Sequence, residues 1–159
     1  MKKPKMLVIG NSGSGKSTCV NLLATDKIKA SMDDSYLVKK YLGLQKTVDW
    51  ILNDTGDESV IASNAHETLF WDLAAAKNRR DNSLDKIFIV YLYNSVPSSR
   101  YERLKSSGRA PDHCAIPMSW DPLVNDLCRL AADISINTVD MTPEEVAGIL
   151  KTLSAHLKA

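Results

Sequence analysis

The sequence predicts an α/β fold, in which helices cover both faces of a five-stranded parallel sheet. Short apolar runs alternate along the chain with segments whose apolar residues recur at helical spacing, the order typical of βαβ units. The run 87–93 is almost continuously apolar, as in a strand that is buried on both faces. Because 159 residues suit one domain with its own core, we expect residues 1–159 to form a single domain.

Five short segments are expected to form the strands of this sheet. They are residues 6–9, 28–31, 59–63, 87–93 and 134–136. The second segment is followed closely by Asp33 and Asp34, so we expect two carboxylates at the tip of that strand. In the last segment, Ile134 and Ile136 alternate with polar residues, which is the two-residue period of a strand.

Helices are expected between and after the strands, because apolar residues there recur every three to four positions. The first helix begins near Ser14, and Thr142-Pro143-Glu144-Glu145 starts the last one with a capping box and a proline. Trp50 and Trp71 fall on helical patterns and are expected in the core. The other residues expected to face the core are Leu123, Leu127, Leu130, Val146, Ile149, Leu150, Leu153 and Leu157. The remaining apolar residues of the helical segments are Val20, Leu22, Leu23, Leu44, Val48, Ile51, Leu52, Leu69, Phe70 and Leu73, of which the last three share one face with His66.

The composition is that of a globular protein, with 44% hydrophobic and 25% charged residues. A net charge of +1 predicts no strong overall attraction to nucleic acid or to a membrane. Cys19, Cys114 and Cys128 are odd in number and lack metal-type spacing, which suits reduced thiols, and Cys19 is expected to pack in the core. We expect a cytoplasmic protein without a signal peptide or membrane span, and oligomeric state is not readable from the sequence.

A complete phosphate-binding loop, or P-loop, follows the first predicted strand. It consists of Gly10, Asn11, Ser12, Gly13, Ser14, Gly15, Lys16 and Ser17, with Thr18 next in the chain. The glycines let successive backbone N–H groups face one anion, and the following helix adds its positive end. Lys16 would contact the β- and γ-phosphates of the nucleotide, and the Ser17 hydroxyl would bind Mg²⁺. The sequence therefore predicts a P-loop NTPase fold that binds a nucleoside triphosphate and Mg²⁺; ATP is preferred to GTP only because it is usual for this class.

Other polar residues follow the predicted strands and are expected near this loop. Asp33, the pair Ser63-Asn64, and Asn94 each come at the end of a strand. Because ligands of open parallel sheets bind beyond the carboxyl ends of the strands, these side chains would gather around the bound nucleotide.

Two classes of P-loop protein fit the sequence poorly. A small GTPase would carry an Asn-Lys-x-Asp pattern, which is absent. A motor ATPase would carry an acidic residue at the end of an apolar strand, where this chain has Ser63-Asn64 and Tyr93-Asn94. The kinases therefore remain as the favoured class.

The P-loop, the Asp33-Asp34 pair and a later segment that contains three arginines occur together in this chain. In this combination the chain resembles the small P-loop kinases of the adenylate-kinase and shikimate-kinase type. The resemblance extends over nearly the whole length. It implies that residues 97–119 form a lid whose arginines, Arg100, Arg103 and Arg109, close over the transferring phosphate. The segments 133–138 and 142–146 are similar to the last strand and helix of those kinases.

Within that group, the front of the chain looks most like the kinase domain of polynucleotide 5′-hydroxyl kinases. The likeness rests on the loop from Gly10 to Thr18 and on the Asp33-Asp34 pair after the second strand. It implies that Asp33 is the general base on the acceptor hydroxyl. The phage kinases that phosphorylate 5-hydroxymethyluracil in DNA are a related resemblance.

The candidate site residues follow from the motif and these resemblances. Lys16, Asp33, Arg103 and Arg109 are the catalytic candidates, and Ser17 and Asp33 are the candidate Mg²⁺ ligands. Asp34, Tyr36, Asn64 and Arg100 are the candidates for acceptor binding. The Asp pair could instead cap a helix, Asn64 could be a cap, and His66 could pack in the core. The basic run 77–80 could be a solvated helix end or a DNA contact.

The sequence thus predicts an ATP- and Mg²⁺-dependent kinase that phosphorylates a hydroxyl, with a nucleotide or DNA acceptor. The preferred acceptors are a polynucleotide 5′-hydroxyl or 5-hydroxymethyluracil in DNA. A nucleoside-monophosphate or small-metabolite kinase is the first alternative. A P-loop NTPase or nucleotide-dependent interaction module without an acceptor is the second.

Overall fold

Within the residues that the structure describes, one parallel sheet of five strands forms the centre of the protein, as the sequence predicts. The computed structural model describes residues 3–10, 16–23, 30–32, 43–53, 59–62, 67–95 and 121–157. The strands are β1 (Lys5–Ile9), β2 (Ala30–Met32), β3 (Val60–Ala62), β4 (Ile87–Tyr93) and β5 (Ile134–Asn137). Their order in the sheet is β2-β3-β1-β4-β5, so β1 is the central strand.

The register aligns the strands so that their carboxyl ends lie along one edge of the sheet. Val8 of β1 pairs with Ala62 of β3 on one side and with Val90 of β4 on the other. Ala62 pairs in turn with Met32, the last residue of β2. On the other side of β1, Tyr93 pairs with Asn137, so β4 and β5 also end together at this carboxyl edge.

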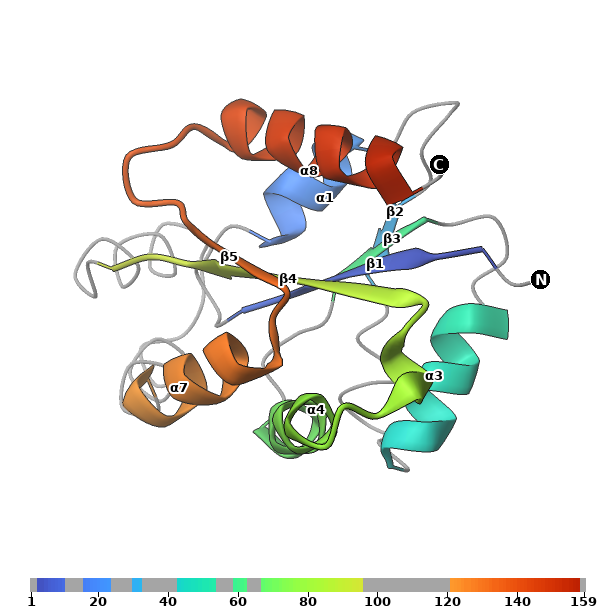
Figure 1. The fold of residues 1–159 in the computed structure, drawn as a ribbon. Coiled ribbons are helices and arrows are strands. Elements are labelled where there is room, and N and C mark those ends of the chain that lie inside the picture. The colour runs from blue at the N-terminus through green and yellow to red at the C-terminus, as the bar shows by residue number, and fades with distance from the viewer. Residues whose placement is uncertain are drawn as a thin grey trace.

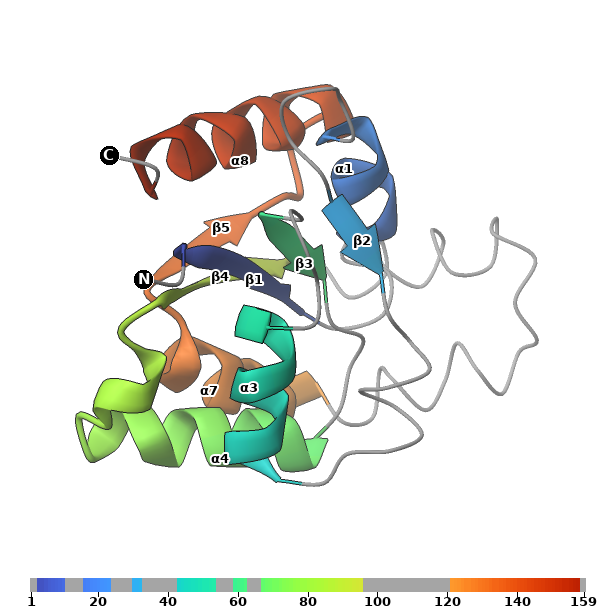
Figure 2. The same ribbon diagram turned by 90° about the vertical axis from the view of Figure 1, so that its right-hand side faces the viewer.

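Helices cover both faces of the sheet, which confirms the predicted layers (Figures 1 and 2). On one face lie α1 (Lys16–Leu23) and α8 (Pro143–Leu157), which pack against each other. On the opposite face lie α3 (Leu44–Asn53), α4 (Glu67–Asn78) and α7 (Asp121–Ala131). A short 3₁₀ helix, η1 (Asn82–Leu84), leads from α4 into β4. This arrangement is a three-layer α/β fold.

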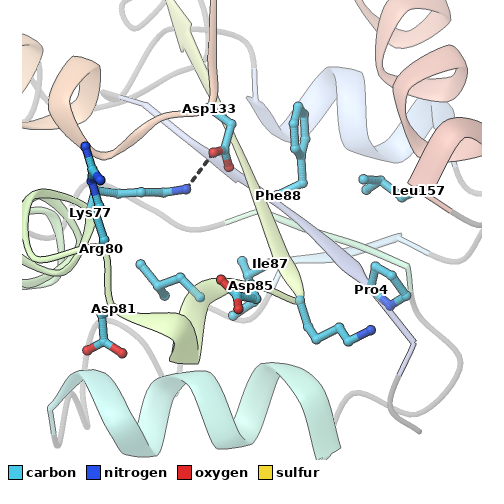
Figure 3. A pocket seen from close by; sticks show the side chains of 11 residues that line it. Pro4, Lys77, Arg80, Asp81, Asp85, Ile87, Phe88, Asp133 and Leu157 are labelled. Carbon is cyan, nitrogen blue, oxygen red and sulfur yellow. Dashed lines mark hydrogen bonds and ion pairs between the residues drawn. The ribbon is translucent and has the colours of Figure 1, made fainter.

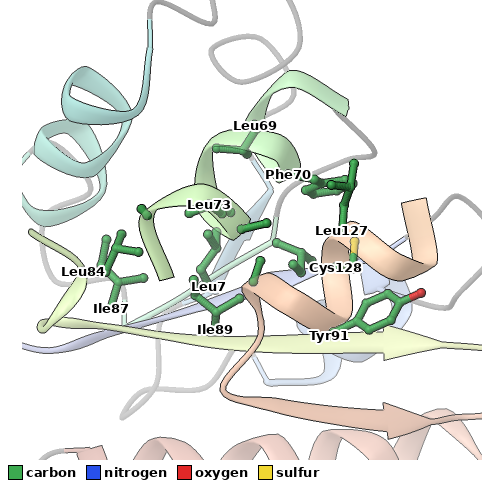
Figure 4. Close-up of a cluster of buried hydrophobic side chains, with 14 of the residues drawn as sticks. Leu7, Leu69, Phe70, Leu73, Leu84, Ile87, Ile89, Tyr91, Leu127 and Cys128 are labelled. Atoms are coloured by element: carbon green, nitrogen blue, oxygen red, sulfur yellow. The ribbon is translucent and has the colours of Figure 1, made fainter. Parts of the chain in front are cut away.

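Alternate residues of the central strands supply two separate cores. Leu7 and Ile9 of β1 join the cluster beneath α3, α4 and α7, which Figure 4 shows with Ile89 and Tyr91 of β4. Met6 and Val8 of the same strand point the other way and join the cluster beneath α1 and α8. Because both faces of these strands are buried, they read as continuous apolar runs in the sequence.

Local signals fix where the helices begin. In the capping box of α8, the Thr142 N–H donates to Glu145 Oε1 (3.1 Å) and the Glu145 N–H donates to Thr142 Oγ1 (3.2 Å), as predicted. Gly43 precedes α3 with a φ of +109°, a conformation that side-chain-bearing residues rarely adopt. Its carbonyl oxygen accepts bonds from the Thr47 N–H (3.1 Å) and Thr47 Oγ1 (3.0 Å).

Four residues expected in the core lie at the surface instead, so those predictions were wrong. In α7 the buried face is centred on Leu127, Cys128 and Ala131, and is rotated away from Leu123 and Leu130. In α4 the residues facing the sheet leave Trp71 on the outer side, 51% exposed. The other misplaced residues are Leu123 (42% exposed), Leu130 (66%) and Ile149 (37%).

Candidate active site at the carboxyl edge of the sheet

The P-loop sequence lies between the end of the central strand and the start of a helix. β1 ends at Ile9, the buried Gly10 follows, and α1 begins at Lys16. Residues 11–15 lie outside the described part of the chain, as do the side chains of Lys16 and Ser17. Thr18, in the first turn of α1, is exposed. The backbone on both sides of the loop thus has the strand-then-helix order that the motif requires.

The point where the helices change faces lies beside this loop. The connection after β1 leads to α1 on one face of the sheet, whereas the connection after β3 leads to α4 on the opposite face (Figure 2). β1 and β3 are hydrogen-bonded neighbours. In open parallel sheets, ligands bind in the crevice at such a switch point, beyond the carboxyl ends of the strands.

Most of the predicted site residues lie outside the described residues. Asp33 and Asp34 come directly after Met32, whose partner Ala62 pairs with Val8 of β1. Met32 therefore lies at the carboxyl edge, and Asp33 and Asp34, which follow it in the sequence, are outside the described residues. Tyr36, Asn64, Arg100, Arg103 and Arg109, together with the predicted lid at 97–119, also fall outside, so their roles stay predictions.

On the side of β1 away from β3 and β2, hydrogen bonds join the carboxyl ends of β4 and β5. Asn137 Nδ2 donates to Ser95 Oγ (2.9 Å), while Asn137 Oδ1 accepts from the N–H groups of Ser95 (3.3 Å) and Val139 (3.2 Å). The next residue, Thr138, is 2% exposed and donates from both its N–H (2.8 Å) and its Oγ1 (3.2 Å) to the Tyr93 carbonyl. Asn94, between these contacts, is also buried.

Sequence reasoning placed Asn94 at this edge but missed the role of Asn137 and Ser95. The available signal was the polar residue that ends the alternating Ile134–Asn137 strand, since side-chain amides often bond to nearby backbone. Its partner Ser95 lies 42 residues away in the chain, so only the pairing of β4 with β5 brings the two together.

Two stacked tyrosines near the carboxyl end of β4 contact helix α7. The rings of Tyr91 and Tyr93 stack with their centroids 5.3 Å apart. The Tyr91 hydroxyl donates to Asn125 Oδ1 of α7, and the Arg129 guanidinium lies 4.9 Å from the centre of the Tyr93 ring. Helix α7 is therefore tied to β4 close to the candidate site.

At the opposite, amino edge of the sheet lies a pocket of about 390 Å³ (Figure 3). Pro4, Phe88 and Leu157 form part of its wall. Lys77 donates to Asp133 Oδ1 (2.5 Å), and Asp133 Oδ2 accepts the Ile89 N–H (2.7 Å). The paired charges tie the end of α4 to the β4–β5 pair, and the pocket lies at the edge opposite the P-loop.

The basic run 77–80 ends α4 at this amino edge. The Asp81 N–H donates to the Ala76 carbonyl (2.9 Å) and the Arg80 N–H donates to the Lys77 carbonyl (3.1 Å), the pattern of a Schellman helix end. Arg80 has a φ of 56° at the position where glycine is usual. Arg79 contacts Asp81 at 3.4 Å. The run thus acts in ending the helix and in local ion pairs.

Asp81 caps η1 and has a perturbed carboxyl group. Its Oδ1 accepts the Ser83 N–H at 2.9 Å. This bond, assisted by the Ser83 hydroxyl and by Arg79, lowers the pKa of Asp81 below its usual range, because each of these contacts favours the carboxylate.

Neither a cluster of metal-ligating side chains nor a membrane-spanning helix is found in the part of the chain that the structure describes. No group of three His, Cys, Asp or Glu residues comes together there. The helices within those ranges lack the length and apolar character needed to cross a bilayer.

No protein-family model matches this chain, and no curated protein matches its sequence. Solved structures do match its fold over nearly the whole length. The shikimate kinase from Acinetobacter baumannii in complex with shikimate has a TM-score of 0.62 at 15% identity, and the match covers 98% of this chain and 95% of that one.

Two further kinases show similar agreement. The shikimate kinase from Bacteroides thetaiotaomicron has a TM-score of 0.57 at 14% identity, covering 98% of this chain and 99% of that one. The thymidylate kinase from Candida albicans has a TM-score of 0.56 at 14% identity, covering 98% and 92%. At such low identity these likenesses establish the fold alone: the chain has the α/β fold of small P-loop kinases.

Proposed function

We propose that this protein is a small kinase that transfers the γ-phosphoryl group of ATP to an acceptor hydroxyl. One observation carries the proposal: the P-loop sequence joins the carboxyl end of central strand β1 to the first residue of α1. The shared fold with shikimate and thymidylate kinases supports it. Where a P-loop joins a strand to a helix in this way, its backbone N–H groups and the positive end of the helix can face one anion, as triphosphate binding requires.

The residues of the loop fit a magnesium-bound triphosphate. Backbone amides of residues 10–17 would hold the phosphate oxygens, Lys16 would offset charge on the β- and γ-phosphates, and the Ser17 hydroxyl would ligate Mg²⁺. When bound, the metal ion neutralises charge on the transferring group. Hydroxyl, amide and ammonium groups are the donors that such a ligand prefers.

We assign the acceptor side to the residues after β2 and β3, on the other side of β1 from β4 and β5. Asp33 would take the proton of the acceptor hydroxyl while that oxygen bonds to the γ-phosphorus, and the bond from this phosphorus to ADP breaks. Asp34, Tyr36 and Asn64 would contact the acceptor. Arg103 and Arg109, with Arg100 beside them, would offset charge in the transition state.

A small acceptor, either a nucleotide or a hydroxylated metabolite, has the better support. The basic run 77–80 lies at the amino edge, away from the P-loop, with Lys77 and Arg79 paired to acids. It therefore gives no support to binding of a polynucleotide. A polynucleotide 5′-hydroxyl and 5-hydroxymethyluracil in DNA are kept as alternative acceptors in the test.

The test is transfer of label from γ-labelled ATP, with Mg²⁺, to separate acceptor pools. The pools are shikimate and sugars, nucleoside monophosphates, DNA with a free 5′-hydroxyl, and DNA containing 5-hydroxymethyluracil. We expect label in one of the two small-molecule pools. Label in DNA alone would overturn the small-acceptor part of the proposal. Phosphate release that no acceptor stimulates would overturn the kinase proposal in favour of an NTPase.

Asp33→Asn separates transfer from binding. The amide is close in size to the carboxylate but cannot take the acceptor proton at neutral pH. We expect the variant to bind ATP with unchanged affinity and to lose transfer by roughly 10²-fold or more. Asp85→Asn, the same change at an exposed residue of the amino edge, is the matched control and should retain transfer.

A further inference from the structure

Asn137 is the side chain that joins the ends of β4 and β5. Its amide group makes three hydrogen bonds: two to Ser95 and one to the Val139 N–H. Ser95 belongs to the residues that follow β4 (94–95) and Val139 to those that follow β5 (138–139), and we call these two segments the exits of the strands. A surface side chain that bonds to two segments 42 residues apart restricts the backbone of both. Thr138 reinforces this contact through its two bonds to the Tyr93 carbonyl.

The contact lies on the side of the P-loop strand where the nucleoside part of ATP would extend. Strand order places β4 and β5 on one side of β1 and places β3 and β2 on the other. Asp33 and Asn64, the acceptor candidates, follow β2 and β3. If the acceptor occupies the β2–β3 side, as we propose, then a nucleotide with its phosphates at the end of β1 would extend its nucleoside part over the β4–β5 side of the carboxyl edge.

We propose that Asn137 is a positioning residue for the nucleotide: it holds the exits of β4 and β5 in the arrangement that the bound nucleotide needs. The proposal rests on the proposed function, because it assumes that the P-loop binds ATP. A binding surface that is already ordered loses less conformational entropy on binding, so such a clamp raises affinity without touching the reacting atoms. Asn137 would therefore affect nucleotide binding and leave the chemical step unchanged.

The sheet supplies a matched control at its opposite edge. Asp133 is also a surface side chain of the β5 segment, and it bonds to the backbone of β4 through the Ile89 N–H at 2.7 Å. Loss of Asp133 should loosen the same pair of strands at the amino edge. A merely structural role for Asn137 would give Asn137→Ala and Asp133→Ala the same functional phenotype.

The experiment is calorimetric titration of the full chain with ATP and Mg²⁺ at about 0.15 M salt, together with thermal unfolding of each variant. Asn137→Ala should raise the Kd for ATP about tenfold, because the nucleotide would then have to order the residues after β4 and β5 when it binds. Asp133→Ala should lower Tm yet leave the Kd within twofold. Asn137→Asp should restore affinity to within about threefold, because its oxygens still accept both N–H groups and the Ser95 hydroxyl can donate.

If Asn137→Ala does not fold, Ser95→Ala removes only the Oγ contact and should raise the Kd two- to threefold. An unchanged Kd in the folded Asn137 variant, or an equal rise in Asp133→Ala, would overturn the inference. These outcomes are read from ATP binding alone. A wild-type chain that binds ATP but labels no acceptor would therefore refute the kinase proposal while the role of Asn137 was still decided. Lack of ATP binding by the wild type would refute both.

Discussion

The carboxyl and amino edges of the sheet differ in what their polar side chains do. At the amino edge, Lys77 pairs with Asp133 and Arg79 contacts Asp81, so the charges serve to close the end of α4. At the carboxyl edge, Asn137 and Thr138 hold the exits of β4 and β5, and the P-loop sequence follows β1. A pocket is present at the amino edge, yet the phosphate-binding motif lies at the other.

Position relative to the strand ends therefore indicates the site better than charge or concavity does. The basic run 77–80 suggests an anion site when read as sequence alone. In the structure it ends a helix at the amino edge, where ligands of open parallel sheets do not usually bind.

The largest expected effect is a difference in phosphoryl transfer between two lysine substitutions, one at each edge of the sheet. Lys16→Ala should reduce phosphoryl transfer by on the order of 10³-fold, because it removes positive charge from the transferring phosphate. Lys77→Ala should leave transfer unchanged and cost about 1 kcal/mol of unfolding free energy, through loss of the bond to Asp133. Steady-state transfer assays and urea unfolding measure the two effects. Comparable losses of transfer in both variants would remove the distinction between the edges.

A smaller effect tests whether the amino edge is purely structural. Arg80 has a φ of 56°, so Arg80→Gly should stabilise the protein by about 0.5–1 kcal/mol, since glycine adopts this conformation without strain. Transfer should not change. Arg79→Gly, one residue earlier, is the control and should destabilise, because it adds backbone freedom and removes the contact with Asp81. A loss of transfer in Arg80→Gly would assign this edge a functional role.

The smallest expected effect concerns pH. The lowered pKa of Asp81 means that its carboxylate is favoured in the folded state. Its contribution to stability is present above the ordinary Asp pKa of about 3.9 and is lost as pH falls through the lowered folded value. Asp81→Asn keeps an oxygen for the Ser83 N–H but cannot titrate. Acid unfolding followed by circular dichroism should therefore be slightly steeper for the wild type below about pH 4, and identical profiles would contradict this interpretation.

Much of the fold could be predicted from the sequence, because its local signals are strong. The buried run Ile87–Tyr93 and the capping box at Thr142 lie where predicted. Cys19 is buried, as expected. β2 covers Ala30–Met32 where residues 28–31 were expected, since a short strand with mixed composition marks its ends poorly. The strand order was not predictable, because it depends on contacts between distant segments.

The outward positions of Leu130 and Trp71 were not predictable for a different reason. Helical spacing identifies a stripe, but the packing partner decides which side of that stripe is buried. In α7 the sheet contacts Cys128 and Ala131, and Leu130 is left 66% exposed. The P-loop was readable because its chemistry requires a fixed spacing, whereas the Asn137 contact required knowledge of which strands are neighbours.

Both the proposed function and the role of Asn137 require the nucleotide to bind at the carboxyl edge of the sheet. Hydrogen–deuterium exchange of the wild-type chain, with and without ATP and Mg²⁺, tests it most directly. We predict slower exchange in peptides that cover residues 6–23, 94–95 and 137–139, and no change in residues 77–88 at the amino edge. Protection confined to residues 77–88, with none in 6–23, would contradict the claim.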